Sequence, residues 1–108
     1  MAGLIKKILV AEDEKPMAKA LVLKLNHAGF EAKAAFNGEE AIEEMAKNDY
    51  DLLLLDMIMP RMDGFTVLKK LKEQGTKTKI VVTSNLGQEE DFNKAKELGA
   101  TDYFVKSD

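Results

Sequence analysis

Five short apolar runs alternate along the chain with longer stretches in which apolar residues recur every three or four positions. The runs occupy residues 8–11, 32–36, 51–56, 79–84 and 101–105. Most of them are continuously apolar over their short length, which is typical of strands that are covered on both faces. Strands that alternate with helical stretches predict an α/β domain, with a five-stranded parallel sheet doubly wound by helices.

Four amphipathic helices are predicted between these strands. Their apolar faces comprise Met17, Leu21, Leu25 and Ala28; Ala41, Ile42 and Met45; Phe65, Leu68 and Leu71; and Phe92, Ala95 and Leu98. A glycine follows three of the four stretches, at positions 29, 75 and 99, where a left-handed residue commonly ends a helix. Asn37 and Glu40 have the spacing of a capping box that opens the second helix. The local signals therefore agree with the hydrophobic periodicity.

Composition narrows the class of protein. The chain has 108 residues, a formal net charge of −3, no cysteine and one histidine. The absence of cysteine excludes disulfides and thiolate metal sites. The negative net charge argues against direct binding of nucleic acid. The longest apolar run, residues 52–55, is far too short to span a membrane, and no signal peptide opens the chain. We expect a single domain over residues 1–108, located in the cytoplasm.

Polar side chains gather where the predicted strands end. The residues at these ends are Glu12 and Asp13, then Asp56, then Thr83 and Ser84, and finally Lys106. Any one of them alone is typical of a helix cap or a solvated turn. Ligands of open parallel sheets bind beyond the carboxyl ends of the strands, however, and all of these residues converge on that edge.

Three of these residues are carboxylates that the expected topology brings close together. The first and third strands are neighbours in a doubly wound sheet, so Glu12, Asp13 and Asp56 are expected within a few ångströms of one another. Like charges at that distance require compensation, and Mg²⁺ binds oxygen ligands of this kind together with a substrate phosphate. Lys106 and Ser84 would complete a pocket of phosphate size opposite the metal.

The segment that follows the third strand carries the most specific motif. Residues 56–64, D-M-I-M-P-R-M-D-G, resemble the phosphoacceptor loop of the receiver domain of two-component response regulators (CheY-like) in the placement of Asp56, Pro60 and Gly64. The resemblance covers essentially all of the chain. Glu12 stands where aspartate is more frequent in the family, and residue 107 is a serine where proline is usual.

The resemblance implies a flavodoxin-like sheet in the order 2-1-3-4-5 and a phosphoryl-transfer chemistry. Asp56 would accept a phosphoryl group from a histidine kinase. Mg²⁺ would be held by Asp13, by Asp56 and by the backbone carbonyl of Ile58, with Glu12 acting through water. Positioning and charge stabilisation dominate this chemistry.

The remaining matched residues would stabilise and report the phosphorylated state. Lys106 and Ser84 would contact the phosphoryl oxygens. Tyr103, three residues before the lysine, resembles the aromatic switch that reorients with Ser84 on phosphorylation. The chain would then signal to a downstream effector or target protein. It would not be an enzyme in the usual sense, because it assists only its own phosphorylation and dephosphorylation.

Two alternatives use the same fold. A haloacid-dehalogenase-type phosphatase needs a second aspartate two residues after its nucleophile, and that position is Ile58, which cannot donate a proton. A receiver-like docking module that is not phosphorylated remains open, although such domains usually lose part of the acidic cluster or the lysine. Nucleotide-binding glycine motifs are absent from the sequence.

The handedness of the crossovers predicts an uncovered region of the sheet. Right-handed connections in the order 2-1-3-4-5 place the first helix alone on one face and the other three on the opposite face. Receiver domains usually add a fifth helix after the lysine, and this sequence stops at Asp108. We therefore expect the fold to lack that helix and to expose an apolar strip. A homodimer, a partner or a C-terminal segment would cover the strip.

Overall fold

The computed structural model describes residues 5–57, 59, 62–84 and 89–105. The elements, in chain order, are β1 (Lys7–Ala11), α1 (Lys15–His27), β2 (Glu31–Ala35), α2 (Gly38–Lys47), β3 (Leu52–Asp56), α3 (Gly64–Glu73), β4 (Lys79–Ser84), α4 (Glu89–Glu97) and β5 (Asp102–Val105). Among these described residues, no helix is both long enough and apolar enough to cross a membrane.

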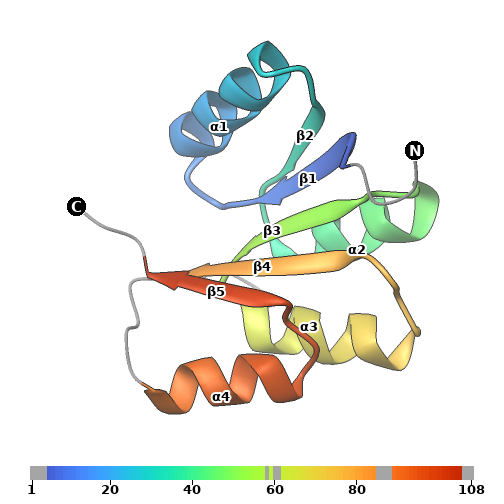
Figure 1. Cartoon of the computed structure of the whole chain (residues 1–108), viewed down its shortest axis with the longest axis vertical. Helices are drawn as coiled ribbons and strands as arrows, with labels where there is room; N and C mark the ends of the chain where they lie inside the picture. Colours follow the sequence, from blue (N-terminus) through green and yellow to red (C-terminus); the bar gives the residue numbers. More distant parts are fainter. Residues whose placement is uncertain (1–4, 58, 60–61, 85–88, 106–108) are drawn as a thin grey trace.

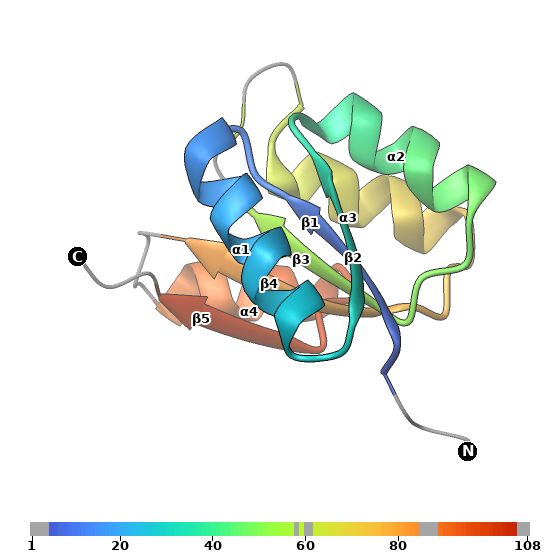
Figure 2. The same cartoon turned by 90° about the horizontal axis from the view of Figure 1, so that it is seen from above.

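The five strands form one parallel sheet in the order β2-β1-β3-β4-β5, as predicted. Figures 1 and 2 show α1 on one side of this sheet and α2, α3 and α4 on the other. Ala11 pairs with Leu55, and Asp56 pairs with Thr83, so the strands that carry the candidate site residues end side by side. The architecture is the flavodoxin-like, doubly wound fold.

The main core lies between the sheet and the three helices on its larger side. Alternate residues of β3 and β4, such as Leu53, Leu55 and Val82, are fully buried on that side. They pack against α3 through Val67 and Leu68, which are also fully buried. Alternate strand residues face this core because successive side chains of a strand point to opposite faces, and α3 buries the apolar face from which it was predicted.

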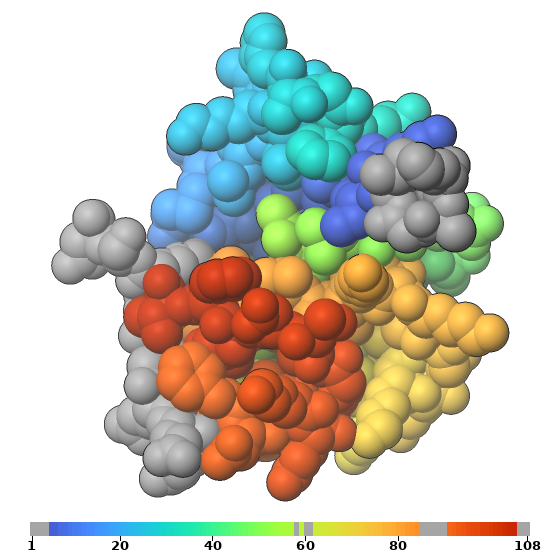
Figure 3. All heavy atoms as spheres, viewed as in Figure 1, coloured from blue at the N-terminus to red at the C-terminus, as the bar shows by residue number. Residues whose placement is uncertain are grey.

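The opposite face of the sheet is only partly covered. Leu54 and Val81, which pair across β3 and β4, are half-buried although their sequence neighbours are buried. Phe104 on β5 is 56% exposed. Atoms of β4 and β5 (orange and red in Figure 3) lie at the surface below α1. On this face the described residues thus include one exposed apolar side chain, Phe104, beside two half-buried ones, which agrees with the expected apolar strip.

Helix ends follow the predicted signals with one adjustment. Asn37 Oδ1 accepts a hydrogen bond from the Glu40 N–H at 2.9 Å, which confirms the capping interaction. Glu40 Oε1 accepts the N–H of Phe36 at 2.9 Å, one residue earlier than a standard capping box. The cap thus uses the N–H of Phe36. The apolar run predicted that this strand extends to residue 36, but β2 ends at Ala35.

The buried face of α1 differs from the predicted one. Met17 is 40% exposed, whereas Ala18 is fully buried and Leu21 and Leu25 are half-buried. The helix begins at Lys15, and its buried residue is Ala18, whose side chain is a single methyl group. A small side chain there lets the backbone of α1 approach the sheet. Ala28 lies beyond the end of the helix and is exposed.

Candidate metal centre at the strand ends

The sheet holds the backbone in place just beyond the ends of β1 and β3. The N–H of Glu12 donates to the Ala35 carbonyl at 3.0 Å and extends the pairing of β1 with β2 by one residue. The N–H of Met57 donates in the same way to the Thr83 carbonyl on β4, also at 3.0 Å. Glu12 and Asp56 are therefore fixed by sheet hydrogen bonds rather than placed on a free loop.

Three carboxylates converge at this edge, as expected. One oxygen from each of Glu12, Asp13 and Asp56 lies within 4.8 Å of the other two. Glu12 is 3% exposed and Asp56 is 6% exposed, whereas Asp13 is half-buried and opens the cluster toward solvent. Such a set of hard oxygen donors fits Mg²⁺, which uses one or two carboxylates and keeps several waters.

The segment after Asp56 is anchored at both of its ends. The N–H of Gly64 donates to the Met57 carbonyl at 2.9 Å, and the Asp63 side chain caps α3 by accepting the Thr66 N–H at 2.9 Å. A Cβ added to Gly64 would lie 2.5 Å from Met57 Sδ, so the glycine is required for space. The sequence placed Gly64 in the motif but gave no reason for it.

The methionines of this segment belong to the core. Met57 and Met59 are buried in the main hydrophobic cluster, and Met62 packs against that cluster. They therefore act as apolar packing residues, a role that suits the flexible methionine side chain. His27 is exposed in the last turn of α1, consistent with a solvated residue at the negative end of the helix dipole.

Ser84 and Tyr103 lie on the same face of the sheet, on neighbouring strands. Tyr103 pairs with Val82, two residues before Ser84, so the period of two places both side chains toward α4. Ser84 is fully buried and Thr83 is half-buried. The Tyr103 ring packs edge-on against Phe92 of α4, with 4.3 Å between ring centroids. Ser84 and the Phe92–Tyr103 ring pair therefore lie on the same side of the sheet.

Two of the predicted site residues, Lys106 and Ile58, lie outside the described residues. The predicted roles of the Lys106 ammonium and the Ile58 carbonyl therefore rest on the sequence alone. The described part of the candidate centre consists of the three carboxylates together with Ser84, and Tyr103 lies on the adjoining strand.

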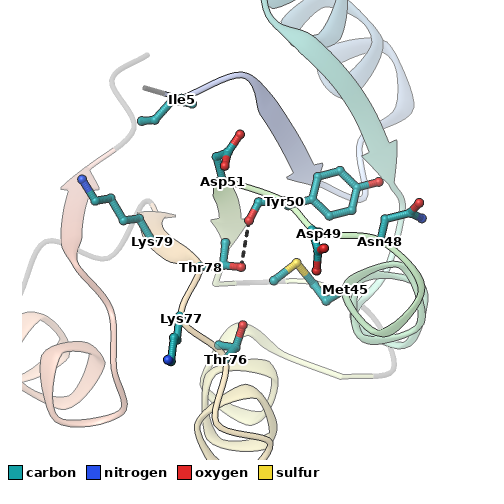
Figure 4. A pocket seen from close by; sticks show the side chains of 10 residues that line it. All are labelled: Ile5, Met45, Asn48, Asp49, Tyr50, Asp51, Thr76, Lys77, Thr78 and Lys79. Carbon is teal, nitrogen blue, oxygen red and sulfur yellow. Dashed lines mark hydrogen bonds between the residues drawn. The ribbon is translucent and has the colours of Figure 1, made fainter. Parts of the chain in front are cut away.

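A groove of about 470 Å³ lies at the other end of the molecule (Figure 4). Residues 48–51 and 76–79 line it, together with Ile5 and Met45. These residues precede β3 and β4, so the groove lies at the amino-terminal edge of the sheet, away from the carboxylate cluster. Two aspartates and two lysines are among the lining residues, and this mixture of signs favours neither anions nor cations.

A hydrogen-bond network beside this groove ties α2 to the sheet. The Tyr50 hydroxyl donates to Glu44 Oε1 at 2.8 Å, and the Lys33 ammonium donates to Glu44 Oε2 at 3.1 Å. The Tyr50 hydrogen bond and the Lys33 ammonium hold the pKa of Glu44 below its usual value. Burial and the Glu44 charge raise the pKa of Tyr50. These residues have a structural role far from the carboxylates.

The fold and the acidic cluster together define a flavodoxin-like domain with a candidate cation site at its strand ends. Residues 8–107 match the family described as the response regulator receiver domain. The chain therefore belongs to this family. Response regulators of two-component systems are signalling proteins, so the family membership agrees with a signalling domain rather than a conventional enzyme.

Curated relatives and solved structures support the same family. The transcriptional regulatory protein DltR of Streptococcus agalactiae is 37% identical over 100 residues, which are 93% of this chain and 45% of DltR. The chain thus spans less than half of that relative. The receiver domain of Francisella response regulator 1452 has a TM-score of 0.90 and 34% identity, covering 94% of this chain and 84% of the other.

A further solved relative contains a bound metal complex. Response regulator protein TrrA from Thermotoga maritima, in complex with Mg(2+)-BeF, has a TM-score of 0.83 and 32% identity to this chain. The match covers 95% of this chain and 88% of the TrrA chain.

Proposed function

We propose that this chain is the phosphoacceptor module of a response regulator, with Asp56 as the residue that receives the phosphoryl group. The observation that carries the proposal is the convergence of the Glu12, Asp13 and Asp56 carboxylates within 4.8 Å at the carboxyl edge of the sheet. Family membership and the Mg(2+)-BeF complex of TrrA support it.

The proposed reaction is a direct transfer between two side chains. A carboxylate oxygen of Asp56 attacks the phosphorus of a phosphohistidine on the donor kinase, and an acyl phosphate forms as the phosphorus–nitrogen bond breaks. The leaving imidazole nitrogen keeps the electron pair and takes a proton. Asp56 is buried and fixed by the sheet, so the attacking oxygen needs little reorganisation.

Mg²⁺ is the proposed cofactor. Asp13, Asp56 and the Ile58 carbonyl would hold it, with Glu12 acting through water. When bound, the cation neutralises charge on the transferring phosphoryl oxygens. Glu12 and Asp13 would thus bind and orient the cation. Neither of them has to transfer a proton.

The proposed switch links the phosphoryl group to β5. Lys106 and Ser84 would contact the phosphoryl oxygens, and movement of Ser84 would change the space available to Tyr103. The adjacency of Ser84 and Tyr103 on one face of the sheet supports this coupling. The Phe92–Tyr103 ring pair is the element that would repack.

Partners follow from this chemistry. A cytoplasmic histidine kinase would supply the phosphoryl group, and a downstream effector would read the switch. DltR is by name a transcriptional regulator, so an effector region that controls transcription is one proposed output. The exposed apolar strip with Phe104 would suit a homodimer. The rival proposal is a docking module of the same fold that is never phosphorylated.

Intact-mass measurement after incubation with Mg²⁺ and acetyl phosphate separates the two proposals. The wild-type chain should gain one phosphoryl group, and Asp56→Asn should gain none while it keeps its circular dichroism spectrum. Asp49→Asn is the matched control, because it makes the same change in an exposed aspartate beside the distant groove. A wild-type chain that gains no mass would favour the docking module.

A further inference from the structure

Gly38, the first residue of α2, allows an unusually close contact with the segment that follows Asp56. A Cβ added at this position would lie 2.5 Å from the Met62 carbonyl oxygen and 2.7 Å from Met62 Cβ. It would also lie 2.9 Å from Val67 Cγ2 on α3. Two of these three contacts are made by atoms that lie on or next to the backbone, so a flexible side chain cannot simply swing away.

Backbone conformation does not explain the glycine. Of the glycines that the structure describes, those with positive φ are 29, 75 and 99, and Gly38 is not among them. Glycine at a helical position costs about 0.5–1 kcal/mol relative to alanine. The helix start is already secured by the Asn37 cap. What the missing side chain provides at Gly38 is therefore space for Met62.

The contact bears on the segment that joins Asp56 to α3. At one end of that segment Gly64 lies against Met57, where an added Cβ would come within 2.6 Å of the Met57 Cα. Met62, two residues before Gly64, lies against Gly38. Met62 is thus packed against the first turn of α2, and Met57 against the first turn of α3, and each of these helices begins with a buried glycine.

We propose that Gly38 is a positioning residue for Asp56. By letting α2 approach Met62, it sets where residues 62–64 pack against Met57, and hence how the carboxylate of the neighbouring Asp56 lies against Glu12 and Asp13. This inference rests on the proposed function of Asp56. Gly38 belongs to α2, which is remote in sequence from the motif of residues 56–64.

Gly38→Ala is expected to slow phosphorylation with little change in stability. Ordinary contact begins at 3.4 Å, so the Met62 carbonyl would have to move by about 1 Å. A misplacement of about 1 Å in a reacting geometry can slow a reaction up to a hundredfold, and we expect at least about a tenfold slower phosphorylation. Alanine is the better helix former, so helix propensity opposes any loss of stability.

Ala46→Gly is the matched control. Ala46 is exposed in the same helix, and its replacement by glycine changes helix propensity in the opposite direction without touching Met62. The Ala46→Gly variant should melt at a lower temperature and be phosphorylated at the wild-type rate. Gly38→Ala should keep its melting temperature and be phosphorylated slowly by acetyl phosphate at saturating Mg²⁺.

Methyl NMR of labelled methionines tests the same idea without phosphoryl transfer. The Met57 and Met62 signals should shift in Gly38→Ala and stay unchanged in Ala46→Gly, and a Mg²⁺ titration should show weaker binding only in Gly38→Ala. If the wild-type chain gained no phosphoryl group, the proposed function would fail. The Mg²⁺ titration would still show whether Gly38 affects the placement of the carboxylates.

Two outcomes would overturn the inference. One is a Gly38→Ala variant with wild-type methionine signals, Mg²⁺ affinity and phosphorylation rate. The other is a phosphorylation rate that falls in both variants in step with the fall in melting temperature. This result would mean that only helix stability matters. If Gly38→Ala fails to fold, the Met62→Gly variant tests the same contact by changing Met62 instead of Gly38. It removes the Met62 Cβ that faces α2 and should also slow phosphorylation and weaken Mg²⁺ binding.

Discussion

Replacing Asp13 by asparagine should stabilise the metal-free chain and weaken its response to Mg²⁺. Asp13 contributes one of the three carboxylate oxygens that lie within 4.8 Å of one another. Asparagine keeps the size of the side chain and one oxygen but removes the charge. It therefore relieves repulsion from Glu12 and Asp56 at the cost of a cation ligand.

The size of the repulsion follows from that distance. Two unit charges 4.8 Å apart repel by about 3.5 kcal/mol at an effective dielectric constant of 20 and by about 0.9 kcal/mol in bulk water. Asp13 is half-buried, so its environment lies between these limits. We expect the free energy of unfolding of Asp13→Asn without metal to exceed that of the wild type by about 1–3 kcal/mol.

Adding Mg²⁺ should reduce the stability advantage of Asp13→Asn over the wild type. At a concentration 100 times its dissociation constant, a ligand that binds only the folded chain adds about 2.7 kcal/mol to stability. A variant that binds ten times more weakly would gain only about 1.4 kcal/mol under the same conditions. The advantage of Asp13→Asn should therefore shrink or disappear as Mg²⁺ is added.

Urea unfolding followed by circular dichroism, with and without Mg²⁺ at low ionic strength, measures both effects. Asp49→Asn is again the control and should behave as the wild type, because Asp49 lies at the opposite edge of the sheet. The reasoning fails if Asp13→Asn is less stable than the wild type without metal. It also fails if both proteins gain the same stability from Mg²⁺.

Three further predictions concern stability away from the site. Leu53→Ala, at a fully buried position of β3, should lower the free energy of unfolding by about 2–5 kcal/mol in urea titrations, and a loss below 1 kcal/mol would contradict the assigned core. Tyr50→Phe removes the 2.8 Å hydrogen bond to Glu44, so it should cost about 1 kcal/mol and raise the Glu44 pKa in an NMR titration; an unchanged pKa would argue against the bond. Backbone amides at the start of β1 lower the pKa of Asp51 from 3.8, so this carboxylate stabilises the fold above that pH, and the stability gap between wild type and Asp51→Asn should close as the pH falls below it. A gap that stays constant down to pH 2 would exclude that linkage.

Local patterns in the sequence were sufficient for the elements and for the carboxylate cluster. Each helix is marked by an apolar period of 3.6 residues and each strand by a short apolar run, and parallel strands all end at one edge of the sheet. Glu12, Asp13 and Asp56 follow such strands directly, so their convergence needed only the strand order. Ser84 and Tyr103 could be placed on neighbouring strands by the same argument.

Only the tertiary structure decided how these elements fit together in detail. Met17 has the helical spacing of a core residue, yet the approach of α1 to the sheet buries Ala18 and leaves Met17 exposed. The contact of Gly38 with Met62 joins residues that are distant in sequence, and a glycine at a helix start gives no local sign of what lies against it. The groove beside Tyr50 likewise depends on where α2 and α3 end. Periodicity determines which face of a segment is apolar, but the distance between two backbones depends on every side chain that lies between them.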